Sequence, residues 1–151
     1  MSSTASRPAE ILLVEDSPAD ITLVEEIFEE SRIPCTLHVV QDGQAAMDHL
    51  RRAPGYENAV QPDLVLLDLN LPKMGGAEVL VEIKNDPELR RIPVVVLTTS
   101  DQEADVLRSY DQHANSYIIK PIGYEQFMQV VHTLEDFWFS TVRLPSRDGP
   151  P

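Results

Sequence analysis

Four short runs of this sequence are apolar at every position, and they constrain the fold more than any other feature. Each run has the length of a β-strand and leads directly into a polar residue; the runs are residues 11–14, 64–67, 94–97 and 117–119. Strands without a polar face are covered on both sides, as in parallel sheets that carry helices on both faces. A fifth run, residues 36–40, alternates in polarity, so we expect it at an edge of the sheet.

Segments with helical periodicity separate these runs. Ser17-Pro18 is a good helix start, and an apolar stripe follows it at helical spacing, formed by Ile21, Val24, Ile27 and Phe28. Further apolar stripes lie within 45–50, 77–83, 106–110 and 127–138. This alternation predicts one α/β domain over residues 10–139, a doubly wound parallel sheet of five strands in the order 2-1-3-4-5. Residues 1–9 and 140–151 are expected to be tails.

Composition excludes several classes of protein. The chain has 12 basic and 25 acidic residues and a formal net charge of −13, so unaided binding to nucleic acid or anionic lipid is not expected. Cys35 is the one cysteine, which rules out an intrachain disulfide and favours a cytoplasmic location. The sequence contains neither an apolar run of membrane-spanning length nor a secretory signal.

Reactive side chains follow the carboxyl ends of the four apolar runs, namely Glu15, Asp16, Asp68, Thr98 and Lys120. In open α/β sheets this edge binds ligands, and neighbouring first and third strands would bring the three carboxylates together. A hard cation such as Mg²⁺ relieves their repulsion, and the lysine adds a second positive charge. Together they suit phosphoryl transfer to a carboxylate.

Each of these residues alone has a simpler explanation. An aspartate after a strand is most often a turn residue or a helix cap, and Thr98-Thr99-Ser100 could be capping hydroxyls. The agreement in order, with each residue following its own buried strand, favours a functional site.

Four stretches carry a resemblance to the response-regulator receiver domains of two-component signalling. They are ILLVEDSP (11–18), LLDLNLPKMGG (66–76), VLTTS (96–100) and YIIKPI (117–122). The resemblance extends over about residues 9–137 and implies a flavodoxin-like fold and a phosphoacceptor rather than an enzyme. Two departures are visible, Glu15 where aspartate is commoner and Gly75-Gly76 where one glycine is usual.

The resemblance assigns a role to each matching position. Asp68 would be the phosphoacceptor; Mg²⁺ would be held by Asp16, Asp68, the backbone carbonyl of Asn70 and, through water, Glu15. Thr98 would be the switch hydroxyl, Tyr117 the switch aromatic and Lys120 the phosphate-binding lysine.

Two rival functions remain open on this fold. A flavodoxin-like cofactor binder needs a phosphate-cradling first loop, whereas Glu15-Asp16-Ser17-Pro18 repels phosphate. An aspartyl-phosphate phosphatase needs a second aspartate two residues after the nucleophile, and Asn70 stands there.

Two further features point to one subgroup of this family. The long loop before residue 64 and the ending FWFSTVRLP (137–145) resemble those of the stand-alone response regulators that partner phytochrome-type sensor histidine kinases. No output domain is expected after residue 139, so output is expected through binding of a downstream protein or through phosphorelay. Phe137, Trp138 and Phe139 cannot all face the core of one helix. We therefore expect a homodimer through the region of the fourth and fifth helices and the C-terminal extension. A monomer that covers these aromatic rings by folding its tail back is the alternative.

Overall fold

The computed structural model describes residues 8–31, 34–99 and 116–120, together with the single positions 123, 125, 126, 128 and 132. Its centre is a five-stranded parallel sheet in the order β2-β1-β3-β4-β5. The strands are β1 (Ala9–Val14), β2 (Cys35–Val40), β3 (Leu64–Asp68), β4 (Val94–Thr98) and β5 (Ser116–Ile119). The predicted fold class and strand order are confirmed, and the alternating strand β2 lies at an edge.

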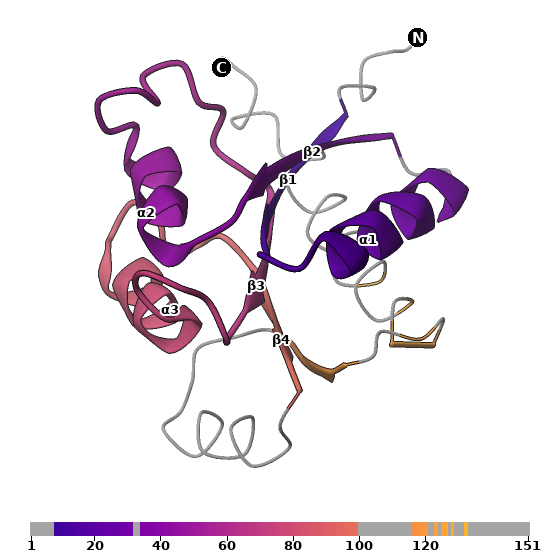
Figure 1. The fold of residues 1–151 in the computed structure, drawn as a ribbon. Coiled ribbons are helices and arrows are strands. Elements are labelled where there is room, and N and C mark those ends of the chain that lie inside the picture. The colour runs from indigo at the N-terminus through magenta and orange to yellow at the C-terminus, as the bar shows by residue number, and fades with distance from the viewer. Residues whose placement is uncertain are drawn as a thin grey trace, which may run out of the picture.

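Three helices are described in full, and they lie on both faces of the sheet. Helix α1 (Pro18–Ser31) covers one face, and α2 (Gly43–Arg51) and α3 (Gly76–Asn85) cover the other (Figure 1). The expected fourth helix lies outside the described residues. Glu125, Gln126, Met128 and His132 are helical; the first two precede the stretch 127–138 where the fifth helix is expected, and the other two lie within it.

The core consists of two apolar layers, which explains why the strand runs have no polar face. Ile11 and Leu13 of β1 pack with α1 residues such as Phe28. Leu12 and Val14, which alternate with them, pack on the side of α2 and α3. Successive side chains of a strand point to opposite faces, so a strand between two layers needs apolar residues throughout.

The helix starts follow the local sequence. Ser17 Oγ accepts a hydrogen bond of 3.4 Å from the backbone N–H of Asp20, as expected of an N-cap before Pro18. Asp42 Oδ1 caps α2 by accepting a 2.7 Å hydrogen bond from the backbone N–H of Ala45. Strand β1 starts at the buried Ala9, one residue before the expected domain boundary.

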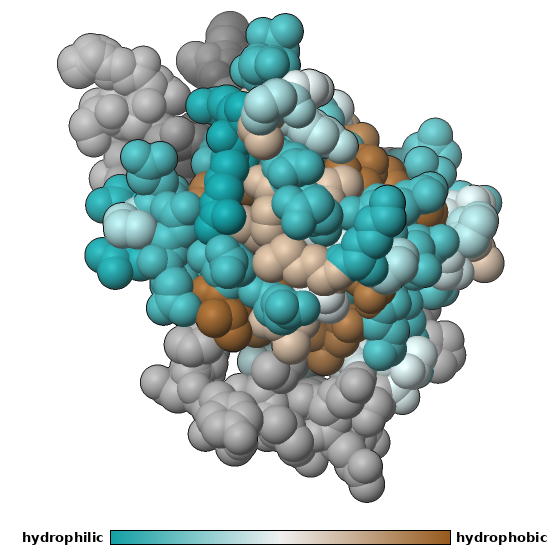
Figure 2. Space-filling model, turned by 60° about the vertical axis from the view of Figure 1, so that its left-hand side comes forward, coloured by the Kyte–Doolittle hydropathy of each residue, from teal (hydrophilic) through white to brown (hydrophobic). Residues whose placement is uncertain are grey.

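The face that carries α2 and α3 is largely hydrophilic around a weakly hydrophobic centre (Figure 2). Among the described residues, the exposed large hydrophobic side chains are Val60 and Val81. None of the described helices has the length and apolar character needed to cross a membrane.

Candidate functional site

The predicted site residues meet at the carboxyl edge of the sheet. Glu15 and Asp16 follow β1, Asp68 ends β3, Thr98 ends β4, and Lys120 follows β5. Strand β1 pairs directly with β3, with Val14 opposite Leu67, so the acidic pair lies beside Asp68. Strand β5 reaches the same edge through β4, because Ile119 lies opposite Thr98.

Three carboxylates form a group that fits a hard cation. One oxygen atom from each of Glu15, Asp16 and Asp68 lies within 4.8 Å of the other two. Glu15 and Asp68 are buried, whereas Asp16 is exposed and leaves the group open to solvent. Carboxylate oxygens with room for water are the ligands that Mg²⁺ prefers, so the residues present fit that ion.

Lys120 follows the edge strand β5, and its side chain reaches this group across β4. Its Nζ donates hydrogen bonds to Glu15 Oε1 at 2.7 Å and to Asp20 Oδ2 at 2.9 Å. The same nitrogen lies 3.5 Å from Asp68 Oδ2. The Lys120 side chain is only 10% exposed, so its charge acts on these carboxylates with little screening by water.

Burial and charge shift the pKa of both partners in the shortest of these contacts. Burial raises the pKa of Glu15, and the nearby Asp68 raises it further; the hydrogen bonds from Lys120 and from the Ser17 backbone oppose this without cancelling it. Burial alone would lower the pKa of Lys120, but its hydrogen bonds to Glu15 and Asp20 and the charge of Asp68 raise it above its ordinary value. The site therefore carries more negative charge than its lysine neutralises.

The loop after β3 holds the Asp68 carboxylate and its backbone. The backbone N–H of Asn70 donates to Asp68 Oδ1 at 3.1 Å, and the Asn70 side-chain amide donates to Thr99 Oγ1 at 3.5 Å. A side chain at Gly76 would collide with the backbone carbonyl of Asp68, whereas one at Gly75 would meet open space. Of the two glycines, Gly76 is therefore the one that the close approach of α3 to β3 requires.

Thr98 and Tyr117 lie on the neighbouring strands β4 and β5. Thr98 is completely buried, and its backbone carbonyl accepts a 2.7 Å hydrogen bond from the backbone N–H of Lys120. Tyr117 is half-buried and packs against the core layer on the side of α2 and α3. Thr98 thus lies on the strand that pairs with the Asp68 strand, and Tyr117 lies one strand further away.

Asp20 is a site residue that the sequence reasoning missed. It lies in the first turn of α1, where an acidic residue is explained by the helix dipole alone. Its position four residues after the exposed Asp16 is the signal that could have pointed toward the site, since α1 starts at the carboxyl edge of β1.

Two of the described histidines, His38 and His49, have structural partners away from this site. His38 Nε2 lies 2.6 Å from Glu10 Oε1, and His49 Nε2 lies 3.2 Å from the backbone carbonyl of Val60. His132 is exposed, and His113 lies outside the described residues.

Comparison with known proteins gives the same interpretation as the geometry. Residues 11–132 match the family model described as response regulator receiver domain. The chain is 50% identical to the response regulator Rcp1 of Synechocystis over 146 residues, which cover 97% of this chain and 99% of Rcp1.

Two solved structures extend this similarity. The phosphorylated cyanobacterial phytochrome response regulator RcpA is 52% identical, with a TM-score of 0.75 over 92% of this chain and 99% of that chain. The Mn²⁺-bound form of Rcp1 is 51% identical, with a TM-score of 0.75 over 91% of this chain and 99% of that one. The three-carboxylate group and Lys120 agree with these relatives, and the chain belongs to the response regulator receiver domains of two-component signalling.

Proposed function

We propose that Asp68 accepts a phosphoryl group from a sensor histidine kinase and that the phosphorylated domain signals to a downstream protein. The observation that carries this proposal is a buried carboxylate with Lys120 Nζ 3.5 Å away and two further carboxylates beside it. A phosphoryl group added to Asp68 meets a cation already in place, and the acidic pair supplies the oxygens for a second one.

In the transfer step, an oxygen of the Asp68 carboxylate attacks the phosphorus atom of phosphohistidine. A P–O bond forms, the P–N bond breaks, and the histidine nitrogen keeps the electron pair of the broken bond. Lys120 neutralises charge on the phosphoryl oxygens, and the N–H of Asn70 holds Asp68 Oδ1 at 3.1 Å so that the carboxylate keeps its orientation.

Mg²⁺ is the cofactor that these residues fit. Asp16, Asp68 and the backbone carbonyl of Asn70 would bind it directly, and Glu15 would act through a bound water. When bound, the ion neutralises the acidic group and the phosphoryl oxygens. The similarity to Rcp1, solved in a Mn²⁺-bound form, supports a divalent cation here.

Thr98 and Tyr117 would report phosphorylation to the surface. The Thr98 hydroxyl would move toward the phosphoryl oxygens, and the space that it leaves would admit the Tyr117 ring. Their positions support this coupling, because β4 pairs with the strand that carries Asp68 and β5 pairs with β4.

The partner is a phytochrome-type sensor kinase in this proposal, because RcpA is itself a phytochrome response regulator and is 52% identical to this chain. We place the protein in the cytoplasm and treat it as a phosphoacceptor or relay protein that catalyses no reaction beyond its own phosphoryl transfer and loss. We also propose a homodimer through the fourth and fifth helices and the C-terminal extension, a region of which the structure describes only residues 125, 126, 128 and 132.

The phosphorylation is tested by adding Mg²⁺ and acetyl phosphate to the full chain and measuring its intact mass. One phosphoryl group should add to the wild type and to Asp48→Asn, a control at an exposed contact of α2. Asp68→Asn should remain unmodified, because an amide is no nucleophile. Full and lasting labelling of Asp68→Asn would refute the role of Asp68.

The readout and the dimer need separate measurements. Thr98→Ala should keep its phosphorylation while the change in the fluorescence of Trp138 upon phosphorylation is reduced.

Light scattering should show a dimer for the wild type and a monomer for a chain that ends at Ser140 and carries Trp138→Ala. A wild type that stays monomeric with and without phosphodonor would refute the dimer.

A further inference from the structure

We propose that Asp20 competes with the phosphoryl group for Lys120 and holds this lysine in a resting position before phosphorylation. The inference rests on the proposed function, since it deepens the role of Lys120 at the same site. Asp20 would be a positioning residue, which acts on the phosphoryl group through the lysine that it holds.

The distances show where the lysine is held. Lys120 Nζ lies 2.9 Å from Asp20 Oδ2 but 3.5 Å from Asp68 Oδ2. At the longer distance the ammonium attracts Asp68 by charge without a hydrogen bond of normal length. The lysine is thus drawn toward α1 and away from the carboxylate that would be phosphorylated.

Asp20 is fixed in place by the start of α1. Its backbone N–H donates to Ser17 Oγ at 3.4 Å, and Pro18 pre-organises the first helical turn. The carboxylate therefore stands where the lysine passes from β5 toward the acidic group, and it holds the ammonium without being part of the three-carboxylate group.

The two short contacts of Lys120 differ in how easily they can be given up. The Glu15 side chain is 1% exposed, so losing the lysine would leave a buried charge without a partner. The Asp20 side chain is 30% exposed, and water can replace the lysine there. When a phosphoryl group with two negative charges forms on Asp68, Lys120 would exchange Asp20, and not Glu15, for a phosphoryl oxygen.

This competition predicts that removing the charge of Asp20 strengthens binding of a phosphoryl group. The probe is beryllofluoride with saturating Mg²⁺, titrated into the full chain and followed by the fluorescence of Trp138 or by calorimetry. Asp20→Asn should bind beryllofluoride about two- to fivefold more tightly than the wild type, the effect expected for a partly exposed ion pair. Asp20→Ser should shift in the same direction, and Asp20→Glu should return toward the wild-type affinity.

Glu25→Gln is the matched control, because it removes one negative charge from an exposed position of the same helix. This control should bind beryllofluoride as the wild type does. A gain in affinity that Asp20→Glu reverses is not produced by structural damage, which weakens ligand binding. In a Lys120→Met chain, titrated to saturation at higher beryllofluoride concentration, Asp20→Asn should give no further gain.

The outcomes separate this inference from the function on which it rests. If the wild type binds no beryllofluoride, or if Asp68→Asn binds it equally well, the proposed function fails. If the wild type binds and Asp20→Asn has unchanged or weaker affinity, only the competition by Asp20 is overturned. A gain that persists in the Lys120→Met chain would also overturn it, because Asp20 would then repel the phosphoryl group directly.

Discussion

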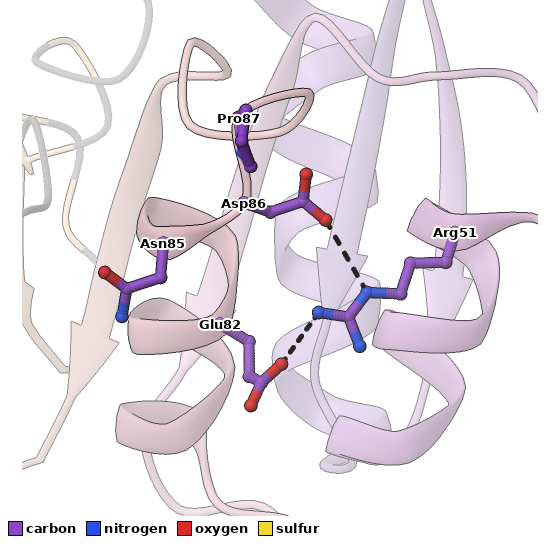
Figure 3. Close-up of a pocket in the computed structure, with 5 residues that line it drawn as sticks. All are labelled: Arg51, Glu82, Asn85, Asp86 and Pro87. Carbon is purple, nitrogen blue, oxygen red and sulfur yellow. Dashed lines mark hydrogen bonds and ion pairs between the residues drawn. The ribbon is translucent and has the colours of Figure 1, made fainter.

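Two clusters of this protein place one cation among several carboxylates, and they differ in their access to water. In the first, Lys120 lies among Glu15, Asp20 and Asp68 at the carboxyl edge of the sheet. In the second, Arg51 at the end of α2 reaches Glu82 and Asp86 across an open pocket of about 300 Å³ beside α3 (Figure 3).

The contact distances of the two clusters are similar. Arg51 Nη2 lies 2.7 Å from Glu82 Oε1, and Lys120 Nζ lies 2.7 Å from Glu15 Oε1. The side chains of Arg51 and Glu82 are 46% and 44% exposed, whereas those of Lys120 and Glu15 are 10% and 1% exposed. A contact length therefore says little about energy, because exposed pairs are screened and buried charges have lost their hydration.

This difference in exposure explains why the two clusters differ in their need for a further ligand. Water satisfies the excess charge of the exposed cluster, so that cluster has little need of a further ligand. At the buried cluster the excess carboxylate charge is relieved by protonation or by a bound cation. Burial of these carboxylates therefore favours the binding of a cation beside them.

The largest effect expected is on the stability of Lys120→Met. This change leaves Glu15 and Asp68 buried without their cation and should lower the free energy of unfolding by about 3 kcal/mol in metal-free buffer at neutral pH. Urea unfolding measures it. A loss below about 1 kcal/mol would mean that the two clusters do not differ as burial predicts.

Asp16→Asn is expected to affect metal binding more than folding. It removes a charged ligand from the open side of the group and should weaken Mg²⁺ binding about tenfold or more in calorimetry. The metal-free protein should keep or gain stability, because carboxylate repulsion falls. Asp86→Asn, a control in the exposed cluster, should leave Mg²⁺ affinity unchanged, and an equal loss there would remove the distinction between the clusters.

The pH dependence of stability should separate the buried cluster from the rest of the molecule. Burial, followed by the charge of Asp68, raises the pKa of Glu15 above its ordinary value of 4.5. The folded chain therefore holds this proton more tightly than the unfolded chain. The resulting stability is complete below pH 4.5 and is lost as the pH rises through the folded value.

Glu15→Gln lacks this titration, so its stability relative to the wild type should improve as the pH rises from 4.5 toward neutrality. Urea unfolding in the presence of a chelator, at several pH values, measures the difference. Parallel stability curves for the two proteins would contradict a raised pKa at Glu15.

The smallest effect is expected at the exposed cluster. Arg51→Gln should lower the free energy of unfolding by about 0.5 kcal/mol or less, because its contacts are screened by water and salt. Thermal or urea unfolding at low and high salt measures it. A loss comparable to that of Lys120→Met would show that exposure does not set the energies of these clusters.

The strand runs and their polar ends could be predicted from the sequence, because a strand that is buried on both faces is apolar at every position. Every residue of the run 64–67 is apolar, and the reactive Asp68 follows it directly. The meeting of Glu15, Asp16 and Asp68 then follows from the strand order. The pair Gly75-Gly76 could be noted as unusual, but the collision that makes Gly76 the required glycine is visible only when α3 is placed against β3.

Contacts between side chains that are far apart in the sequence produce no such local pattern. Asp20 and Lys120 are 100 residues apart, and an aspartate in a first helical turn has a sufficient local explanation. The pairing of His38 with Glu10 likewise depends on the register between β1 and β2, which opposes Leu12 to His38. Periodicity predicts which face a residue occupies, whereas the length and direction of its side chain decide its partner.

The separation of Lys120 from Glu15 by 105 residues has a consequence for the nascent chain. Synthesis proceeds from the N-terminus, so Glu15, Asp16 and Asp68 leave the ribosome well before the lysine that neutralises them. Strand β5 lies at an edge of the sheet, and its pairing with β4 is the event that delivers this cation. Completion of the sheet and charge compensation of the three-carboxylate group therefore occur in the same step of folding.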